Sequence, residues 1–443
     1  MIPSRSAGAS RIPLFALLAA NAVSMTGNVF TLIAIPWFVL QTTGSASQTG
    51  LTSAVAALPF VIAGVFGGAL VDRVGFRRMS VIADLASSVT TALIPLLHLT
   101  IGLEFWQLLV LVFLGGLLDT PGTTARAALL PDLAELAGMR LERVNAIEQM
   151  VQRGSYMLGA PLAGVVIAAT STTSALWFNA ASFIVSAAIV AIFIPAAVAK
   201  MVEANIDLAP DGNALSRYVA DLGDGLRFIR RDPLILAIVI GIAVTNFLDA
   251  MVGLIYPVYA ERVFGSAFDL GILMAASGGG AVLTTLAFAA VGHRLPRRET
   301  YIGCFVLSAV MLFPLALTPP LLICAFAMIG KGVGAGPLNP ILMTVGQERI
   351  PAEMRGRVLG VLTSLAWIAI PAGRLGSGYL IEGFGLIPTL LVVASAYVAV
   401  TLSMLLVPAL RLMDAPSPIM KSAGIALSTM PQPPRTTVAE GRN

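Results

Sequence analysis

Among the charged side chains that lie inside long apolar stretches of this sequence are Asp119, Asp249 and Lys331. If such stretches cross a membrane, an ionised residue at mid-depth costs roughly 2.5–3.5 kcal/mol on insertion scales. This cost is tolerated where the residue faces a cavity or a partner. A carboxyl group that is withdrawn from water favours its protonated form, so it can exchange a proton near neutral pH. These positions are therefore the first candidates for chemistry.

We expect Asp119 or Asp249 to bind and release a proton, with Asp84 as a third candidate about one turn into its own stretch. Lys331 is the expected charge partner. The alternative is a static ion pair between Lys331 and one aspartate, which would be part of the fold without titrating.

The composition explains where such residues must lie. Of 443 residues, 57% are hydrophobic and only 11% are charged, whereas soluble domains average about 25% charged. A soluble core cannot hide this much apolar surface, so lipid is the expected solvent for most of the chain. The net charge of +4 is too small to indicate nucleic acid as a partner.

Other chemistries lack their motifs. Cys304 and Cys324 are too few for a disulfide framework or metal site, and His98 and His293 have no ligand cluster beside them. The sequence has no P-loop, no dinucleotide fingerprint and no GxSxG. We therefore expect no enzyme activity, no metal and no cofactor, and an ion gradient as the energy source.

Apolar stretches of roughly 20 residues are the elements that must position the charges, since this length crosses a bilayer. Twelve are expected. In the first half they cover 13–40, 48–71, 79–99, 105–128, 146–169 and 174–197, and in the second half 234–257, 268–291, 301–318, 321–345, 357–380 and 386–409.

Basic residues orient these stretches. With both termini placed in the cytoplasm, 24 of the 27 Lys and Arg residues fall on the cytoplasmic side and only Arg262 lies in an outside loop. This asymmetry satisfies the positive-inside rule. Lys331 and Arg374 lie within spans, and Arg374 is expected to snorkel outward or to meet Glu382. The predicted location is a cell membrane, with a high-GC bacterium as the source.

The predicted organisation is an all-α integral membrane protein of two six-helix bundles. The loop between the bundles contains an amphipathic segment, Tyr218–Phe228, which is expected at the cytoplasmic membrane surface. The segments are a tail at 1–12, a bundle at 13–197, a cytoplasmic loop at 198–233, a bundle at 234–409 and a disordered tail at 410–443.

A repeated sequence supports two related halves. The link between the second and third spans reads Gly68-x3-Asp72-Arg73-x-Gly75-x-Arg77-Arg78, and the link between the eighth and ninth reads Gly292-His293-Arg294-x-Pro296-Arg297-Arg298. The second segment is a degraded copy of the first, as expected from an internal duplication.

Three further segments make the chain recognisable. They are Ala34-Ile35-Pro36-Trp37 in the first span, Ala125 to Leu133 after the fourth, and Gln347-Glu348-Arg349-Ile350-Pro351-Ala352-Glu353-Met354-Arg355-Gly356-Arg357. With the 68–78 segment, which resembles motif A of the major facilitator superfamily, they resemble the branch of macrolide exporters, the enterobactin exporter and Tap-type multidrug pumps. The resemblance covers about residues 12–410.

This resemblance implies proton-driven export of small amphipathic molecules through a central cavity lined by the first, fourth, seventh and tenth spans. It implies a conformational latch formed by the motif A residues Gly68, Asp72, Arg73, Gly75, Arg77 and Arg78, and an anchored cytoplasmic loop with Arg349, Arg355 and Arg357. A monomer is expected. Side chains that would line the cavity are Asn21, Asn28, Phe30, Trp37, Asn246, Tyr256 and Asn339.

Two details qualify the resemblance. Gly159, Pro161 and Gly164 resemble a loosened exporter motif C, although small residues also serve ordinary helix packing in lipid. Asn28 stands where members of this branch often carry an acid. If that acid helps proton coupling or cation binding in those members, another residue must do so here.

Four other functions remain as alternatives. The first is export of one endogenous metabolite, such as a siderophore or a self-made antibiotic. The second is nutrient symport, against which the motif C remnant argues. An integral membrane enzyme would need clustered ligands that are absent, and a receptor would not explain charges in three spans.

Overall fold

The computed structural model describes residues 11–195 and 214–414, apart from the side chains of 63–70, 72–73, 214–222, 352–353 and 356. All regular structure in these ranges is helical. Each of the twelve predicted stretches coincides with one long helix or with consecutive helices. The prediction of an all-helical membrane protein is confirmed. The tail at 1–10, residues 196–213 with the first part of the central loop, and the tail from 415 lie outside the described residues.

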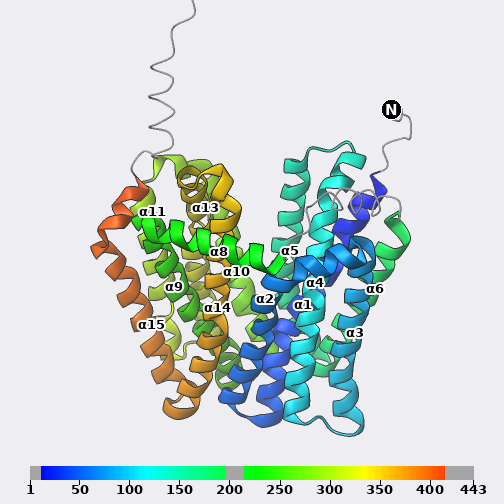
Figure 1. The fold of residues 1–443 in the computed structure, drawn as a ribbon. Helices are drawn as coiled ribbons and strands as arrows, with labels where there is room; N and C mark the ends of the chain where they lie inside the picture. Colours follow the sequence, from blue (N-terminus) through cyan, green and yellow to red (C-terminus); the bar gives the residue numbers. More distant parts are fainter. Residues whose placement is uncertain (1–10, 196–213, 415–443) are drawn as a thin grey trace, which may run out of the picture.

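The first six helices form one bundle, on the right in Figure 1. Tight turns join them: Gly75 adopts φ +87° between the second and third helices, a value that glycine reaches without steric cost. Ser45 starts the second helix by accepting a hydrogen bond from the Gln48 amide. The helices are α1 (Ile12–Thr43), α2 (Ala46–Val74), α3 (Phe76–Thr100), α4 (Phe105–Leu136), α5 (Leu141–Ala169) and α6 (Thr172–Phe193).

The second bundle contains more breaks. The tenth predicted stretch divides into two helices at Gly336 and Pro337, since proline cannot donate the backbone bond that would continue a helix. Lys331 lies just before this break. The elements are α9 (Pro233–Tyr259), η1 (Ala260–Phe264), α10 (Ala267–Val291), η2 (Gly292–Arg294), α11 (Arg297–Val310), η3 (Phe313–Leu317), α12 (Leu321–Ala335), α13 (Leu338–Arg349), α14 (Ala352–Phe384), α15 (Leu386–Ser403), η4 (Met404–Leu406) and η5 (Pro408–Met413).

Both ends of the described chain lie at the same face of the molecule, at the top of Figure 1. We call this the terminal face and the opposite one the distal face. Helix α8 (Ala214–Arg231) lies across the terminal face and packs on α14. There Gly225 approaches the Arg357 carbonyl so closely that an added Cβ would lie 2.9 Å from it.

Ten segments of the described residues are long and apolar enough to cross a membrane. In α2, whose side chains are described without a gap up to Ile62, Ala46–Ile62 is a shorter apolar segment. Helix α5 is absent from the ten, and its first half carries Glu142, Arg143, Glu148 and Arg153. A multi-pass membrane protein is therefore established, while the count of twelve spans stays a prediction.

The bundles meet through small residues near the distal face. On α5, Gly164 lies so close to α10 that an added Cβ would be 2.7 Å from the Ala267 carbonyl oxygen. On α2, a Cβ added at Gly50 would lie 3.0 Å from the Cα of Gly378 on α14. Such contacts let helix backbones approach closely in lipid. The motif C-like segment thus supplies the contact between bundles through Gly164, while Gly159 faces Val29 of α1 within its own bundle.

Hydrogen bonds between the bundles, among the described residues, also lie toward the distal face. Glu382 of α14 accepts from the Ser45 hydroxyl and the Ser47 amide, each at 3.2 Å. Arg374 donates to the Ser53 carbonyl at 3.0 Å. Arg374 was expected to snorkel outward or to meet Glu382. It instead binds a carbonyl of α2, because the close approach of α2 and α14 presents that carbonyl to it.

The two halves repeat one contact at the terminal face. Arg77, at the start of α3, donates to the Ala191 carbonyl near the end of α6 at 2.5 Å. Arg298, at the start of α11, donates to the Leu405 carbonyl just after α15 at 2.7 Å. Helix ends leave such carbonyls unsatisfied, and arginine satisfies them while complementing the helix dipole. The degraded copy of motif A therefore keeps this function.

A valine at Gly164 should force α5 away from α10, because its Cβ would overlap the Ala267 carbonyl. We expect Gly164→Val to lower the apparent Tm in detergent by several degrees, measured by fluorescence-detected size exclusion. Gly154→Val on the same helix is the matched control, since an added Cβ there meets nothing within 4 Å. Equal melting of the two variants would contradict the close contact.

Candidate functional site

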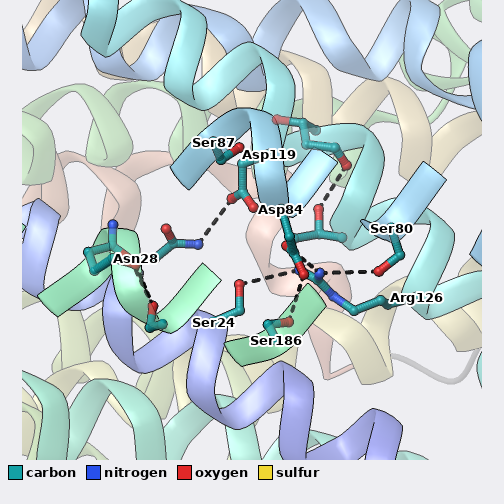
Figure 2. A network of polar contacts seen from close by, with 12 residues as sticks. Ser24, Asn28, Ser80, Asp84, Ser87, Asp119, Arg126 and Ser186 are labelled. Atoms are coloured by element: carbon teal, nitrogen blue, oxygen red, sulfur yellow. Dashed lines mark hydrogen bonds and ion pairs between the residues drawn. The ribbon is translucent and has the colours of Figure 1, made fainter. Parts of the chain in front are cut away.

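A buried ion pair lies in the interior of the first bundle (Figure 2). Arg126 of α4 donates to Asp84 of α3 at 2.7 Å, and their side chains are 1% and 0% exposed. The second carboxylate oxygen of Asp84 accepts from Ser186 of α6 at 2.7 Å. A buried charge needs both a partner and further hydrogen bonds, and these groups supply them. Asp84 was a proton-exchange candidate, and the structure places it in this pair.

Helix α1 contacts the same region through residues four apart, which share one face of a helix. Ser24 lies 3.5 Å from a terminal nitrogen of Arg126. One turn later, Asn28 donates to Asp119 at 3.0 Å. Because Asp119 and Arg126 lie seven residues apart on α4, they also share a face. The two helices therefore meet through two polar rungs, which are visible in Figure 2.

Asp119 lies on the same face of α4 as Arg126 but forms no ion pair among the described residues. It is 8% exposed. One oxygen accepts from Asn28, while the other is buried without a hydrogen-bond partner. Desolvation without compensation penalises the charged form of a carboxyl group. The predicted candidate Asp119 is therefore a buried carboxyl group with one oxygen unsatisfied.

Asp249 and Lys331 lie together in the second bundle. The Lys331 ammonium is 3.4 Å from one Asp249 oxygen, and the Tyr397 hydroxyl donates to the other at 2.8 Å. The side chain of Asp249 is 39% exposed and that of Lys331 is 13% exposed. The predicted charge partner thus meets Asp249 rather than Asp119, in a pair that is open on its aspartate side.

The residues predicted to line a cavity lie in different surroundings. Asn21 donates to Glu148 of α5 at 3.1 Å, and Asn246 donates to the Ala366 carbonyl at 3.2 Å. Asn339 is exposed. The aromatic candidates are buried in the hydrophobic core: Phe30 stacks on Phe178 with ring centroids 4.8 Å apart, and the others are Trp37 and Tyr256.

Motif A is described only in part. The structure does not describe the side chains of Asp72 and Arg73 or the surroundings of Gly68. Gly75 makes the turn between α2 and α3, and Arg77 binds the end of α6. Arg78 is exposed. The latch itself stays a prediction.

The arginines of the predicted cytoplasmic loop lie at the end of α13 (Arg349) and in the first turns of α14 (Arg355 and Arg357), and all make polar contacts. Arg349 pairs with Asp232, the N-cap of α9, at 2.7 Å. Arg355 donates to the Gln347 carbonyl at 2.7 Å, and Arg357 lies 3.5 Å from Asp224 of α8. This loop therefore ties α8, α9 and α14 together at the terminal face.

The sequence reading did not identify Arg126 as a site residue, because the predicted fourth span ended at residue 128 and Arg126 was counted among the cytoplasmic loop charges. Helix α4 continues to Leu136. A signal was present: Arg126 lies two helical turns after Asp119 and is flanked by alanines. Tyr397, Ser24 and Ser186 were also missed, since single hydroxyls within apolar stretches have no distinguishing pattern.

Two bundles of long apolar helices, joined through small residues and holding charged groups in their interior, define a multi-pass membrane transporter. The chain belongs to the Major Facilitator Superfamily, whose family model matches residues 17–373. Its relatives and family are transporters rather than enzymes, as predicted. No group of three or more metal-ligating side chains is found within the described ranges.

The chain is 33% identical to "Multidrug efflux pump Tap" of Mycolicibacterium fortuitum over 92% of its own length and 98% of that protein. It is 30% identical to the pump of the same name from Mycobacterium tuberculosis strain H37Rv, over 91% and 96%. The resemblance to this branch is confirmed. Among solved structures, the nucleoside transporter NupG has a TM-score of 0.73 at 12% identity, over 89% of this chain and 98% of that one. This last similarity shows the fold.

Removing one partner of a buried pair leaves the other charge uncompensated, at a cost of roughly 3–5 kcal/mol. We therefore expect Arg126→Leu to be severely destabilised, measured as loss of the monodisperse peak after detergent extraction. Asp84→Asn/Arg126→Gln, which removes both charges, should recover much of the stability. If the double variant is no more stable than Arg126→Leu, the pair is not the source of the effect.

Proposed function

We propose that this protein is a proton-coupled antiporter that exports drugs or other small amphipathic molecules across a bacterial cell membrane. The terminal face lies in the cytoplasm, as the positive-inside asymmetry predicts. The proton gradient is its energy source. Two relatives that carry the name multidrug efflux pump, matched over nearly their whole length, support the substrate class.

The observation that carries the coupling is the environment of Asp119. A coupling carboxyl must hold a proton in one state of the transporter and release it in another. In the described structure Asp119 is buried, accepts a hydrogen bond from Asn28 on one oxygen and has its other oxygen without a donor. This environment favours the proton. Contact with water in another arrangement of the bundles would favour its release.

The Asp249–Lys331 pair has a different role in this proposal. Its charges neutralise one another, and Tyr397 fixes the carboxylate from the other side. A paired aspartate needs no proton to be tolerated in the membrane. We assign this pair to the fold of the second bundle and to the polar wall that an amphipathic substrate meets.

The amide variant Asp119→Asn keeps the shape of the side chain but cannot exchange a proton. In everted vesicles, we expect it to lose substrate uptake driven by an acidic lumen, by tenfold or more, while downhill substrate exchange without a gradient continues. Asp269→Asn, at the distal start of α10, is the control and should keep both activities. Unchanged gradient-driven uptake in Asp119→Asn would remove Asp119 from the mechanism.

The second carboxylate needs its own test, because Asp249→Asn alone leaves Lys331 without a partner. The double variant Asp249→Asn/Lys331→Gln removes both charges. We expect it to keep gradient-driven uptake in the same vesicles, with altered substrate affinity. If this variant loses gradient-driven uptake and Asp119→Asn does not, Asp249 is the coupling residue.

The substrate class is tested in whole cells. Expression in an efflux-deficient bacterium should raise the inhibitory concentration of several unrelated amphipathic drugs, and a protonophore should abolish the drug efflux measured in the same cells. Protection against none of a broad panel would favour the export of one endogenous metabolite. Efflux that survives the protonophore would contradict proton coupling.

A further inference from the structure

An apolar groove of about 430 Å³ lies on the second bundle near the terminal face, between α9 and the chain after α15. Its size falls in the range of about 300–1,000 Å³ that is typical of small-molecule sites. From α9 it is lined by Leu236, Ile240 and Val244, and from the other side by Val400, Met404 and Val407. Ile240 is 56% exposed and Val244 is 36% exposed, so the groove is open on its outer side.

The corresponding position in the first bundle is filled. There α1 and α6 are the equivalent helices, and Leu14, Leu17 and Leu18 pack into one core cluster with Val190 and Ile194. All of these side chains are nearly inaccessible, at 0–3% exposure. The duplication therefore predicts closed packing at this position, and the second bundle departs from it.

The local reason for the departure is visible in the helices. Gly241 offers no side chain on the groove side of α9, and an added Cβ there would meet only the terminal methyl of Met404, at 3.3 Å. Helix α15 ends at Ser403, and the chain continues as the short helices η4 and η5. The groove between α9 and this part of the chain is therefore left with apolar walls.

Arginines flank the end of this groove. Arg230 and Arg231 end α8 directly before the groove residue Pro233, and Arg411 follows the groove residue Leu410. All three are exposed, and within the described part of the chain no ion pair is recorded for them. The nearby carboxylates are already engaged: Asp232 binds Arg349 and the first turn of α9, while Asp414 accepts from the first amides of α11.

We propose that this groove binds one anionic phospholipid of the cytoplasmic leaflet. An acyl chain lies along α9, and the phosphate lies between Arg231 and Arg411. An apolar channel that ends in basic side chains matches the two parts of such a lipid. The chain's own tail is a poorer occupant, since residues 415–443 carry Lys421, Arg435 and Arg442 against a single acid, Glu440. The assignment to the cytoplasmic leaflet rests on the orientation of the terminal face given under the proposed function.

Native mass spectrometry of the purified full-length protein, titrated with phosphatidylglycerol or phosphatidylcholine, tests this proposal without any transport assay. The unmodified protein should retain one phosphatidylglycerol in preference to phosphatidylcholine. Gly241→Leu fills the groove and should weaken phosphatidylglycerol binding by at least tenfold. Gly303→Leu is the matched control, because it adds the same side chain at an exposed glycine of α11 with nothing within 4 Å.

The charge is tested separately. Arg231→Gln/Arg411→Gln should remove the preference for phosphatidylglycerol while the groove still accepts an acyl chain. Equal binding by Gly241→Leu and Gly303→Leu, or equal retention of the two lipids by the unmodified protein, would overturn the proposal. So would binding that appears only after residues 415–443 are deleted, because the tail would then be the occupant.

Discussion

The ion pair between Arg126 and Asp84 determines how the first bundle is built. It joins α3 to α4 through two buried side chains, and Ser186 adds α6 to the same group. Charges at this depth are costly unless every partner is in place. The pair therefore holds these helices at one spacing. A bundle with this constraint can move as a rigid unit, which is what a transporter made of two bundles needs.

The pair also explains the position of Asp119. Arg126 is the cation on the same face of α4, but its short contact is with Asp84. The carboxylate of Asp119 is left with an amide from Asn28. An acid at position 28 would place two carboxyl groups around one proton, and two such groups cannot both ionise cheaply at this distance. Asn28 instead meets Asp119 as a neutral hydrogen-bond donor, so this contact holds one carboxyl group rather than two.

The sequence predicted the elements well and the contacts less well. Helix positions follow from apolar length alone, so each predicted stretch has its counterpart in the structure. The pairing of Lys331 with an aspartate was expected, since few cations lie at membrane depth. Arg126 and Arg374 were misjudged because hydropathy does not report where a helix extends beyond the bilayer or which carbonyl a neighbour presents. The burial of Phe30 and Trp37 in the core was not predicted for a similar reason. Periodicity does not distinguish a cavity face from a packed face when both are apolar.

The contacts between the bundles differ in kind from those within them. Near the distal face the bundles meet through Gly50, Gly164 and Gly378, with a few hydrogen bonds to Glu382 and from Arg374. Van der Waals contact of this type falls off within a fraction of an ångström, and the hydrogen-bonding groups there can exchange their partners for water. Separation at this face therefore leaves no ion pair broken among the described residues, whereas separating α3 from α4 would break the buried Arg126–Asp84 pair. Buried charges thus hold the helices of the first bundle together, while uncharged and exchangeable contacts join the two bundles. The positions of the buried charges therefore determine which contacts stay rigid and which can separate.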